Sequence, residues 1–155
     1  MDYSIRPASL DDAKGISRVV LSALRETNAS DYSEAVIARV AQHFSPETVC
    51  GLLAQRLVFV AVHDESVIGT ASLDGRVVRT VFIDPRWQGR GIGRALMAEV
   101  ERVAVERRVA VLSVPSSVTA EPFYAKLGFV SVRDIYEGEE RTIVMERPLR
   151  GSQVA

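Results

Sequence analysis

A strand-like segment followed closely by three glycines constrains the fold of this chain most. Residues 77–83 are rich in β-branched side chains and predict a strand, which Pro85 ends because proline has no N–H for a sheet ladder. Apolar residues then recur at helical spacing from Ile92 to Val103. The turn between these segments has glycine at every second position, at Gly89, Gly91 and Gly93. The sequence therefore predicts a glycine-rich turn between a strand and a helix.

Such a turn is suited to binding phosphate. The first N–H groups of a helix lack acceptors within the helix, and glycines leave these groups uncovered by side chains. The positive end of the helix dipole lies behind them. The segment from Arg86 to Arg94 contains three arginines and no acid, and arginine matches phosphate oxygens well. We therefore expect a phosphate-bearing cofactor at this turn.

Two common phosphate-binding motifs do not fit these residues. A Rossmann fingerprint needs G-x-G-x-x-G and an acid about 20 residues further on, and a Walker loop needs G-K-[ST]. Here the last glycine, Gly93, is followed by Arg94 and not by lysine. A nucleotide-binding α/β domain is therefore the weaker interpretation. For the glycines alone, a flexible loop that closes a βα unit stays an alternative.

The segment Gln88-x-x-Gly91-x-Gly93 resembles the pyrophosphate-binding motif Q/R-x-x-G-x-G/A of the GNAT N-acetyltransferase superfamily. It also has the usual setting of that motif, after a strand and Asp-Pro-x-Trp and before a long helix. Residues 121–129, Glu-Pro-Phe-Tyr-Ala-Lys-Leu-Gly-Phe, are similar to the later Y-x-x-x-G-F motif of the same family. The two segments follow the family's order, and the predicted elements cover nearly the whole chain.

The resemblance implies an α/β fold, called α+β in some schemes. It is a mixed, mostly antiparallel sheet of about six to seven strands, with helices on both faces and a central parallel pair that splays apart. We expect one domain over residues 1–150 and a frayed tail over 151–155. The residue patterns predict strands at 3–6, 57–62, 67–73, 77–83, 109–114, 129–135 and 141–146. They predict helices from Ser9, at 34–43, from Pro46, at 91–107 and at 119–127. Residues 115–117 should break the strand at 109–114.

The family uses acetyl-coenzyme A and transfers the acetyl group directly to an amine, so the resemblance implies an acetyltransferase with this cofactor. The strand backbone at Val81, Phe82 and Ile83 would pair with the pantetheine amides, and an N–H near Phe82 or Ile83 would stabilise the oxyanion. Phe123 and Lys126 would also contact the cofactor. The pyrophosphate would be held, mainly through N–H groups, by Gln88, Gly89, Arg90, Gly91, Ile92, Gly93, Arg94 and Ala95.

Tyr124 occupies the family's tyrosine position and is the predicted catalytic acid. A phenol with a reference pKa near 10 is protonated at neutral pH and can donate its proton to the departing thiolate. The alternative is a packing aromatic, since a buried tyrosine often needs only one hydrogen bond.

The general base is open. Many relatives carry a carboxylate on the strand before the glycine turn, but residues 77–83 contain none. The alternatives are a carboxylate from elsewhere (Asp31, Asp74 or Glu121), His43, or a chain of waters. For a lone helical histidine such as His43, a surface position is the simpler interpretation.

The acceptor pocket in the family is shaped by the first two helices. Asn28, Asp31, Tyr32 and His43 are therefore candidate acceptor-binding residues, although capping and turn chemistry explain the first three equally well. Ser116, Ser117 and Thr119 are candidates for cofactor or acceptor contacts, or for helix caps. Acids at 137, 139 and 140 could attract a cationic acceptor, but a solvated turn explains them more simply. The partner is a small-molecule or protein amine, and homodimers are common in the family.

Composition argues against several other classes of function. The net charge of −1 over 155 residues gives no electrostatic reason for binding nucleic acid or an anionic membrane. Cys50 is the only cysteine, and no Cys-His spacing suits a metal, so we expect neither a disulfide nor a metal. The N-terminal residues do not resemble a signal peptide and no apolar run reaches 18 residues, so a cytoplasmic protein is expected.

A non-catalytic acyl-CoA-binding or sensing module is the alternative function. The missing strand carboxylate favours a sensor, and Tyr124 favours an enzyme. We predict the enzyme.

Overall fold

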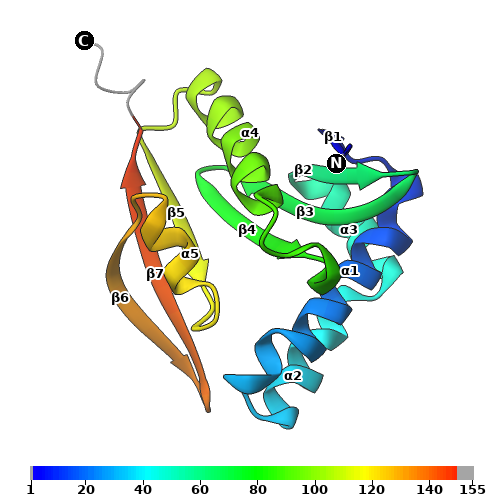
Figure 1. Ribbon diagram of the computed structural model, residues 1–155. Coiled ribbons are helices and arrows are strands. Elements are labelled where there is room, and N and C mark those ends of the chain that lie inside the picture. Colours follow the sequence, from blue (N-terminus) through cyan, green and yellow to red (C-terminus); the bar gives the residue numbers. More distant parts are fainter. Residues whose placement is uncertain (1, 150–155) are drawn as a thin grey trace.

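Seven strands form one sheet in the order β1-β2-β3-β4-β5-β7-β6 (Figure 1). The computed structural model describes residues 2–149, so the predicted tail over 151–155 lies outside the described residues. All neighbouring strands are antiparallel except β4 and β5. The mixed, mostly antiparallel sheet is thus confirmed. The strands are β1 (Ser4–Pro7), β2 (Leu57–His63), β3 (Ser66–Asp74), β4 (Val77–Ile83), β5 (Val111–Ser116), β6 (Val130–Glu137) and β7 (Glu140–Pro148).

Helices cover both faces of the sheet, as expected (Figure 1). Side chains of a strand alternate between faces, and β2 shows this clearly. Val60 belongs to the buried cluster that contains the apolar residues of α1 and α3, whereas Phe59 and Ala61 belong to the cluster with α4 and α5. The helices are α1 (Ala13–Glu26), α2 (Glu34–Ala41), α3 (Pro46–Gln55), α4 (Ile92–Glu106) and α5 (Glu121–Lys126).

The central parallel pair splays apart. β4 and β5 are in register only at Val77 and Ser113, near the start of β4. There the Ser113 N–H donates to the Arg76 carbonyl at 3.0 Å. From this point the two strands diverge, which opens the sheet between their carboxyl ends (Figure 1). The predicted splayed pair is confirmed.

Pro115 does not end its strand, so the prediction that residues 115–117 break it was wrong. β5 runs from Val111 to Ser116 and pairs with β7, where Pro115 lies opposite Val144. Backbone groups alternate sides along a strand, and the Ser113 N–H faces β4. The nitrogen of Pro115 therefore faces the same side, where β4 has already diverged. Proline loses no ladder bond at this position.

The first helix begins later than its cap at Ser9 suggested. Residues Leu10–Asp12 form the 3-10 turn η1, and α1 begins at Ala13. Asp12 accepts hydrogen bonds from the Ser9 N–H (2.8 Å) and from both terminal nitrogens of Arg6 (2.8 and 3.0 Å). Arg6 belongs to β1, so this buried carboxylate ties the first strand to the start of α1. The Arg6 and Ser9 bonds lower the pKa of Asp12 despite the opposing effect of burial.

Replacing this carboxylate should make the stability less dependent on pH. Because the pKa of Asp12 is lower in the folded state, its stabilisation is present above the unfolded value of about 3.9 and is lost as the pH falls through the folded value. We expect Asp12→Asn to lower the free energy of unfolding by about 1–2 kcal/mol at neutral pH. The difference from wild type should shrink below about pH 4. Urea unfolding at several pH values measures the free energy of unfolding of both proteins. Asp11→Asn, at the exposed neighbouring position, is the control. An equal loss in both variants would contradict this role.

Candidate active site

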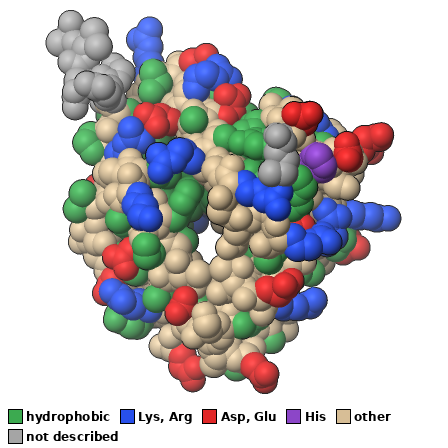
Figure 2. Space-filling model, in the orientation of Figure 1, with side chains coloured by type: hydrophobic (Ala, Val, Ile, Leu, Met, Phe, Trp, Pro, Cys, Tyr) green, Lys and Arg blue, Asp and Glu red, His purple; other side chains and the backbone are tan. Residues whose placement is uncertain are grey.

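A cavity of about 660 Å³ lies where β4 and β5 diverge. Figure 2 shows an opening that passes through the centre of the molecule, and in Figure 1 this region lies between the two strands. Four parts of the chain line the cavity. They are β4 with the turn before α4 and the first turn of that helix, β5 with the following loop and α5, the segment from the end of α1 to Phe44, and the start of β7.

The turn before α4 presents free N–H groups. Gly91 precedes the helix with a left-handed backbone (φ 82°) and no side chain caps the helix. The first helical bond runs from the Ala95 N–H to the Gly91 carbonyl at 3.0 Å. The N–H groups of Ile92, Gly93 and Arg94 come before this bond and have no acceptor within the helix. These three groups and the helix dipole form an anion site beside the cavity.

Two of the predicted phosphate-binding residues fit this site less well. The Ala95 N–H already donates to the Gly91 carbonyl and Ala95 does not line the cavity, so its contribution to phosphate binding stays a prediction that these contacts do not support. Arg90 does not line the cavity either, and its guanidinium lies 4.8 Å from the centre of the Trp87 ring. Gln88, Gly89, Gly91, Ile92, Gly93 and Arg94 do line it.

Asp84 fixes the start of the turn. Its buried carboxylate accepts hydrogen bonds from the Arg86 backbone N–H (3.0 Å) and from the Arg86 guanidinium (3.2 and 3.4 Å). Burial alone would raise the pKa of Asp84, but these bonds outweigh burial and lower it. Asp84 is therefore a carboxylate at neutral pH, and its charge neutralises that of Arg86. Arg94, which lines the cavity, is not paired with Asp84.

The open edge of β4 also faces the cavity. The Asp84 N–H donates to the Ile68 carbonyl on β3 at 2.9 Å, and Phe82 lies opposite Thr70 on β3. Since backbone groups alternate, the N–H and carbonyl of Ile83 face away from β3, toward the opening. The backbone of Phe82 faces β3, so its pairing with a cofactor stays a prediction that the strand register does not support. Val81, Phe82 and Ile83 all line the cavity.

An irregularity in β4 turns Thr80 into the cavity. The register between β3 and β4 shifts between Thr70 and Ser72, and Thr80 has a left-handed backbone (φ 54°), which is unusual for a β-branched residue. The guanidinium of Arg56 donates to the Thr80 hydroxyl at 3.2 Å. The sequence carries no signal for this bulge, and Thr80 was missed as a site residue.

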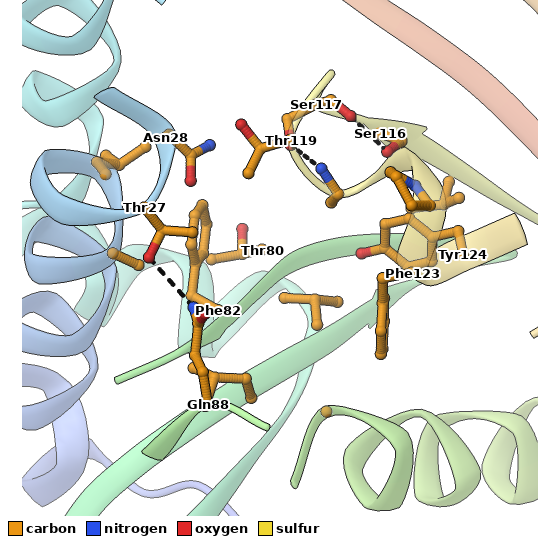
Figure 3. A pocket seen from close by; sticks show the side chains of 18 of the residues that line it. Thr27, Asn28, Thr80, Phe82, Gln88, Ser116, Ser117, Thr119, Phe123 and Tyr124 are labelled. Atoms are coloured by element: carbon orange, nitrogen blue, oxygen red, sulfur yellow. Dashed lines mark hydrogen bonds between the residues drawn. The ribbon is translucent and has the colours of Figure 1, made fainter. Parts of the chain in front are cut away.

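The Tyr124 hydroxyl points into the cavity from α5 (Figure 3). The ring is 4% exposed and packs edge-on against Phe123 (5.1 Å) and Phe129 (5.6 Å). No other residue between 2 and 149 hydrogen-bonds to this hydroxyl. Burial raises the pKa of Tyr124 above its usual range, so the phenol keeps its proton at neutral pH. A phenol that is aimed into a cavity and has no partner can donate a hydrogen bond to a ligand.

Phe123 and Lys126 line the cavity from the same helix. The Phe123 ring lies against Gly93, where an added Cβ would come within 3.2 Å of two ring carbons. Gly93 thus lets α5 approach the first turn of α4 closely.

None of the predicted bases stands free in the cavity. Asp74 lies at the β3–β4 hairpin and pairs with Arg79 at 3.3 Å, and Glu121 accepts a bond from Ser131. His43 is exposed on the 3-10 turn η3 (Gln42–Phe44) and does not line the cavity. The one carboxylate among the described lining residues is Glu140, which is bonded to Arg39 at 2.6 Å.

Of the other predicted acceptor-binding residues, Asn28 and Tyr32 line the cavity and Asp31 does not. Asp31 accepts a hydrogen bond from the Thr119 hydroxyl at 2.7 Å. The Tyr32 hydroxyl accepts from the Val118 N–H (2.6 Å) and donates to the Arg141 carbonyl (3.3 Å). Asn28 is buried, and it is among the lining residues drawn in Figure 3. Ser116, Ser117 and Thr119 also line the cavity, and the Ser117 hydroxyl accepts a hydrogen bond from the Ala120 N–H at 3.1 Å just before α5.

Thr27 is a further lining residue that the sequence analysis missed. Its hydroxyl accepts a hydrogen bond from the Gln88 amide at 3.2 Å, which joins the end of α1 to the glycine turn (Figure 3). In the sequence, Thr27 follows the last apolar residue of the predicted first helix, which indicates the end of a helix but no binding role.

The described residues contain neither a metal-binding cluster nor a membrane-spanning helix. No group of three or more His, Cys, Asp or Glu side chains within residues 2–149 is arranged to hold a metal ion. None of the helices in this part of the chain is long and apolar enough to cross a membrane.

Comparison with known proteins gives consistent matches. A family model described as an acetyltransferase (GNAT) domain matches residues 28–145. An uncharacterised N-acetyltransferase from Escherichia coli K12, YafP, is 27% identical over 113 residues, which are 66% of this chain and 72% of that protein.

Solved structures show the same fold over nearly the whole chain. A GCN5-related N-acetyltransferase from Rhodopseudomonas palustris superposes with a TM-score of 0.89 at 24% identity, covering 96% of this chain and 97% of that one. The PaiA N-acetyltransferase from Thermoplasma acidophilum, in complex with coenzyme A, gives 0.82 at 21% identity, covering 96% and 99%.

Proposed function

The chain belongs to the GNAT acetyltransferase family, and from this premise we propose that it transfers the acetyl group of acetyl-coenzyme A directly to an amine in the cavity between β4 and β5. One observation carries the proposal. The free N–H groups of α4, the open edge of β4 and the Tyr124 hydroxyl all border the same cavity.

These three features suit the three parts of the cofactor. The N–H groups of Ile92, Gly93 and Arg94 would bind the pyrophosphate at the positive end of α4. The backbone of Ile83, and that of Val81, would pair with the pantetheine amides. This arm would then lead to Tyr124. The coenzyme A bound in the Thermoplasma structure of the same fold supports this choice of cofactor.

The bound cofactor supplies an acetyl thioester, and the residues of this chain assist its transfer. The amine nitrogen forms a bond to the carbonyl carbon and the carbon–sulfur bond breaks. The Ile83 N–H would donate a hydrogen bond to the carbonyl oxygen as negative charge develops there. Tyr124 would donate its proton to the departing sulfur. The proton of the amine passes to water, since no free carboxylate lines the described part of the cavity, and water returns a proton to the Tyr124 phenolate.

Transfer should be direct, without an acetylated enzyme. A covalent route needs a nucleophile activated by a neighbouring base. No cysteine or histidine within residues 2–149 lines the cavity, and Cys50 lies on α3. We therefore expect initial-rate plots at several amine concentrations to give intersecting lines, as for a ternary complex. Parallel lines, together with an acetylated protein in the mass spectrum, would contradict direct transfer.

A non-catalytic acyl-CoA-binding module is the second candidate, because β4 has no carboxylate and Glu140 is bonded to Arg39. Calorimetry and thiol release separate the two functions. An enzyme binds acetyl-CoA and releases thiol when amine is added. A sensor binds acetyl-CoA with the same affinity and releases none.

A further inference from the structure

We infer that the acceptor is a small primary amine with an apolar body and no second cationic group, an inference that rests on the proposed function. It comes from three properties of the cavity. The wall formed by α1, α2 and the turns around them carries no charge, positive charges lie nearby, and hydrogen bonds between distant segments close one end.

The wall formed by α1, α2 and the turns around them carries no charge. Among the described residues from 13 to 44, none that lines the cavity is charged. The polar members, Thr27, Asn28 and Tyr32, are neutral. The apolar members are Ala23, Leu24, Val36, Ile37, Val40 and Phe44. Such a wall favours an apolar body and offers hydrogen bonds without a counter-ion.

The charges near the cavity disfavour a polycation. Arg94 and Lys126 line its cofactor side, and Glu140, the only acid among the described lining residues, is already bonded to Arg39. Behind Thr80 lies the half-buried Arg56, which makes no ion pair with a carboxylate in residues 2–149. A polyamine or an aminoglycoside would meet these cations and no unpaired acid among the described lining residues, since Asp31 lies outside the lining and is bonded to Thr119.

Four hydrogen bonds close one end of the cavity. Tyr32 bonds to Val118 and Arg141, Asp31 bonds to Thr119, and Arg39 bonds to Glu140. They join the segment between α1 and α2, and α2 itself, to the loop after β5 and to β7. Burial raises the pKa of Tyr32, so its hydroxyl stays a donor to the Arg141 carbonyl. This bridge limits the length of an acceptor and favours a small molecule over a protein segment.

The same wall accounts for the missing base. Removing an ammonium group from water into apolar surroundings favours its neutral form. An amine that deprotonates on entering needs only water to take its proton.

Calorimetry tests the acceptor class without requiring turnover. Each amine is titrated into the full chain saturated with coenzyme A. We expect 2-phenylethylamine to bind at least about tenfold more tightly than spermidine, kanamycin or a lysine-containing peptide. Tighter binding of spermidine or the peptide, or no binding of 2-phenylethylamine, would overturn the inference.

A matched pair of variants tests the role of the uncharged wall. Asn28→Asp places a carboxylate of nearly the same shape on the cavity wall, and Ser30→Asp adds the same charge two residues away, at an exposed position outside the cavity. We expect Asn28→Asp to shift the affinity ratio toward spermidine by about tenfold and Ser30→Asp to leave it unchanged. Equal ratios in wild type and both variants would overturn the inference.

Thiol release measured in parallel separates this inference from the proposed function. Tight binding of 2-phenylethylamine without thiol release would support the acceptor class and sink the proposed transfer. Thiol release that is fastest with spermidine would overturn the acceptor class and leave the transfer standing.

Discussion

Replacing Tyr124 by phenylalanine should lower kcat by about a hundredfold to a thousandfold and leave the affinity for acetyl-CoA unchanged. The variant removes only the hydroxyl, which points into the cavity and has no hydrogen-bond partner in the described part of the chain. The ring should keep its packing against Phe123 and Phe129, so we expect the fold to be retained. On the proposed mechanism, the variant loses the proton for the departing sulfur. Thiol-release kinetics give kcat, and calorimetry gives the affinity.

Tyr136→Phe is the matched control. Tyr136 lies on β6, is 65% exposed and does not line the cavity, so its hydroxyl takes no part in the chemistry. We expect wild-type kcat for this variant. If Tyr124→Phe also kept wild-type kcat, Tyr124 would be a packing residue and the acid would have to be found elsewhere.

Gly91→Glu should weaken acetyl-CoA binding by at least about a hundredfold. Gly91 has a φ of 82°, which a residue with a Cβ adopts only with strain, and it immediately precedes the free N–H groups of α4. A glutamate at this position covers these groups and repels the pyrophosphate. Calorimetric titration with acetyl-CoA measures the loss.

The strain alone can be measured separately in Gly75→Glu. Gly75 also has a left-handed backbone (φ 63°) and open space around its Cβ position, but it lies in the β3–β4 hairpin, outside the cavity. Both variants should lose similar stability, and only Gly91→Glu should lose cofactor affinity. An unchanged affinity in Gly91→Glu would show that the cofactor does not use the turn before α4.

The part of the site nearest the glycine turn was predictable from the sequence, because the chemistry there belongs to the backbone. Glycine spacing, a strand and a helix together determine where free N–H groups arise. Glycine spacing does not indicate that the Ala95 N–H closes the first turn of α4. The sequence also does not show which way the Phe82 backbone faces, because this depends on the register against β3.

The acceptor side was not predictable, because it depends on contacts between distant segments. His43 and Tyr32 both come from the region of the first two helices, yet Tyr32 lines the cavity and His43 is exposed. Nothing local in the sequence marks the bulge at Thr80 or the bond to it from Arg56. Pro115 predicted a strand end that the structure does not have, because proline ends a strand only where its missing N–H is needed for a ladder bond.

Mass spectrometry of the products formed from labelled acetyl-CoA distinguishes acetyl transfer from binding alone. The protein is incubated with acetyl-CoA that carries ¹³C in the acetyl group and, in separate reactions, with 2-phenylethylamine, spermidine, kanamycin and a lysine-containing peptide. We expect labelled N-acetyl-2-phenylethylamine, formed in equal amount to free coenzyme A. Labelled acetate as the only product, or unchanged acetyl-CoA bound to the protein, with every one of these amines would contradict acetyl transfer.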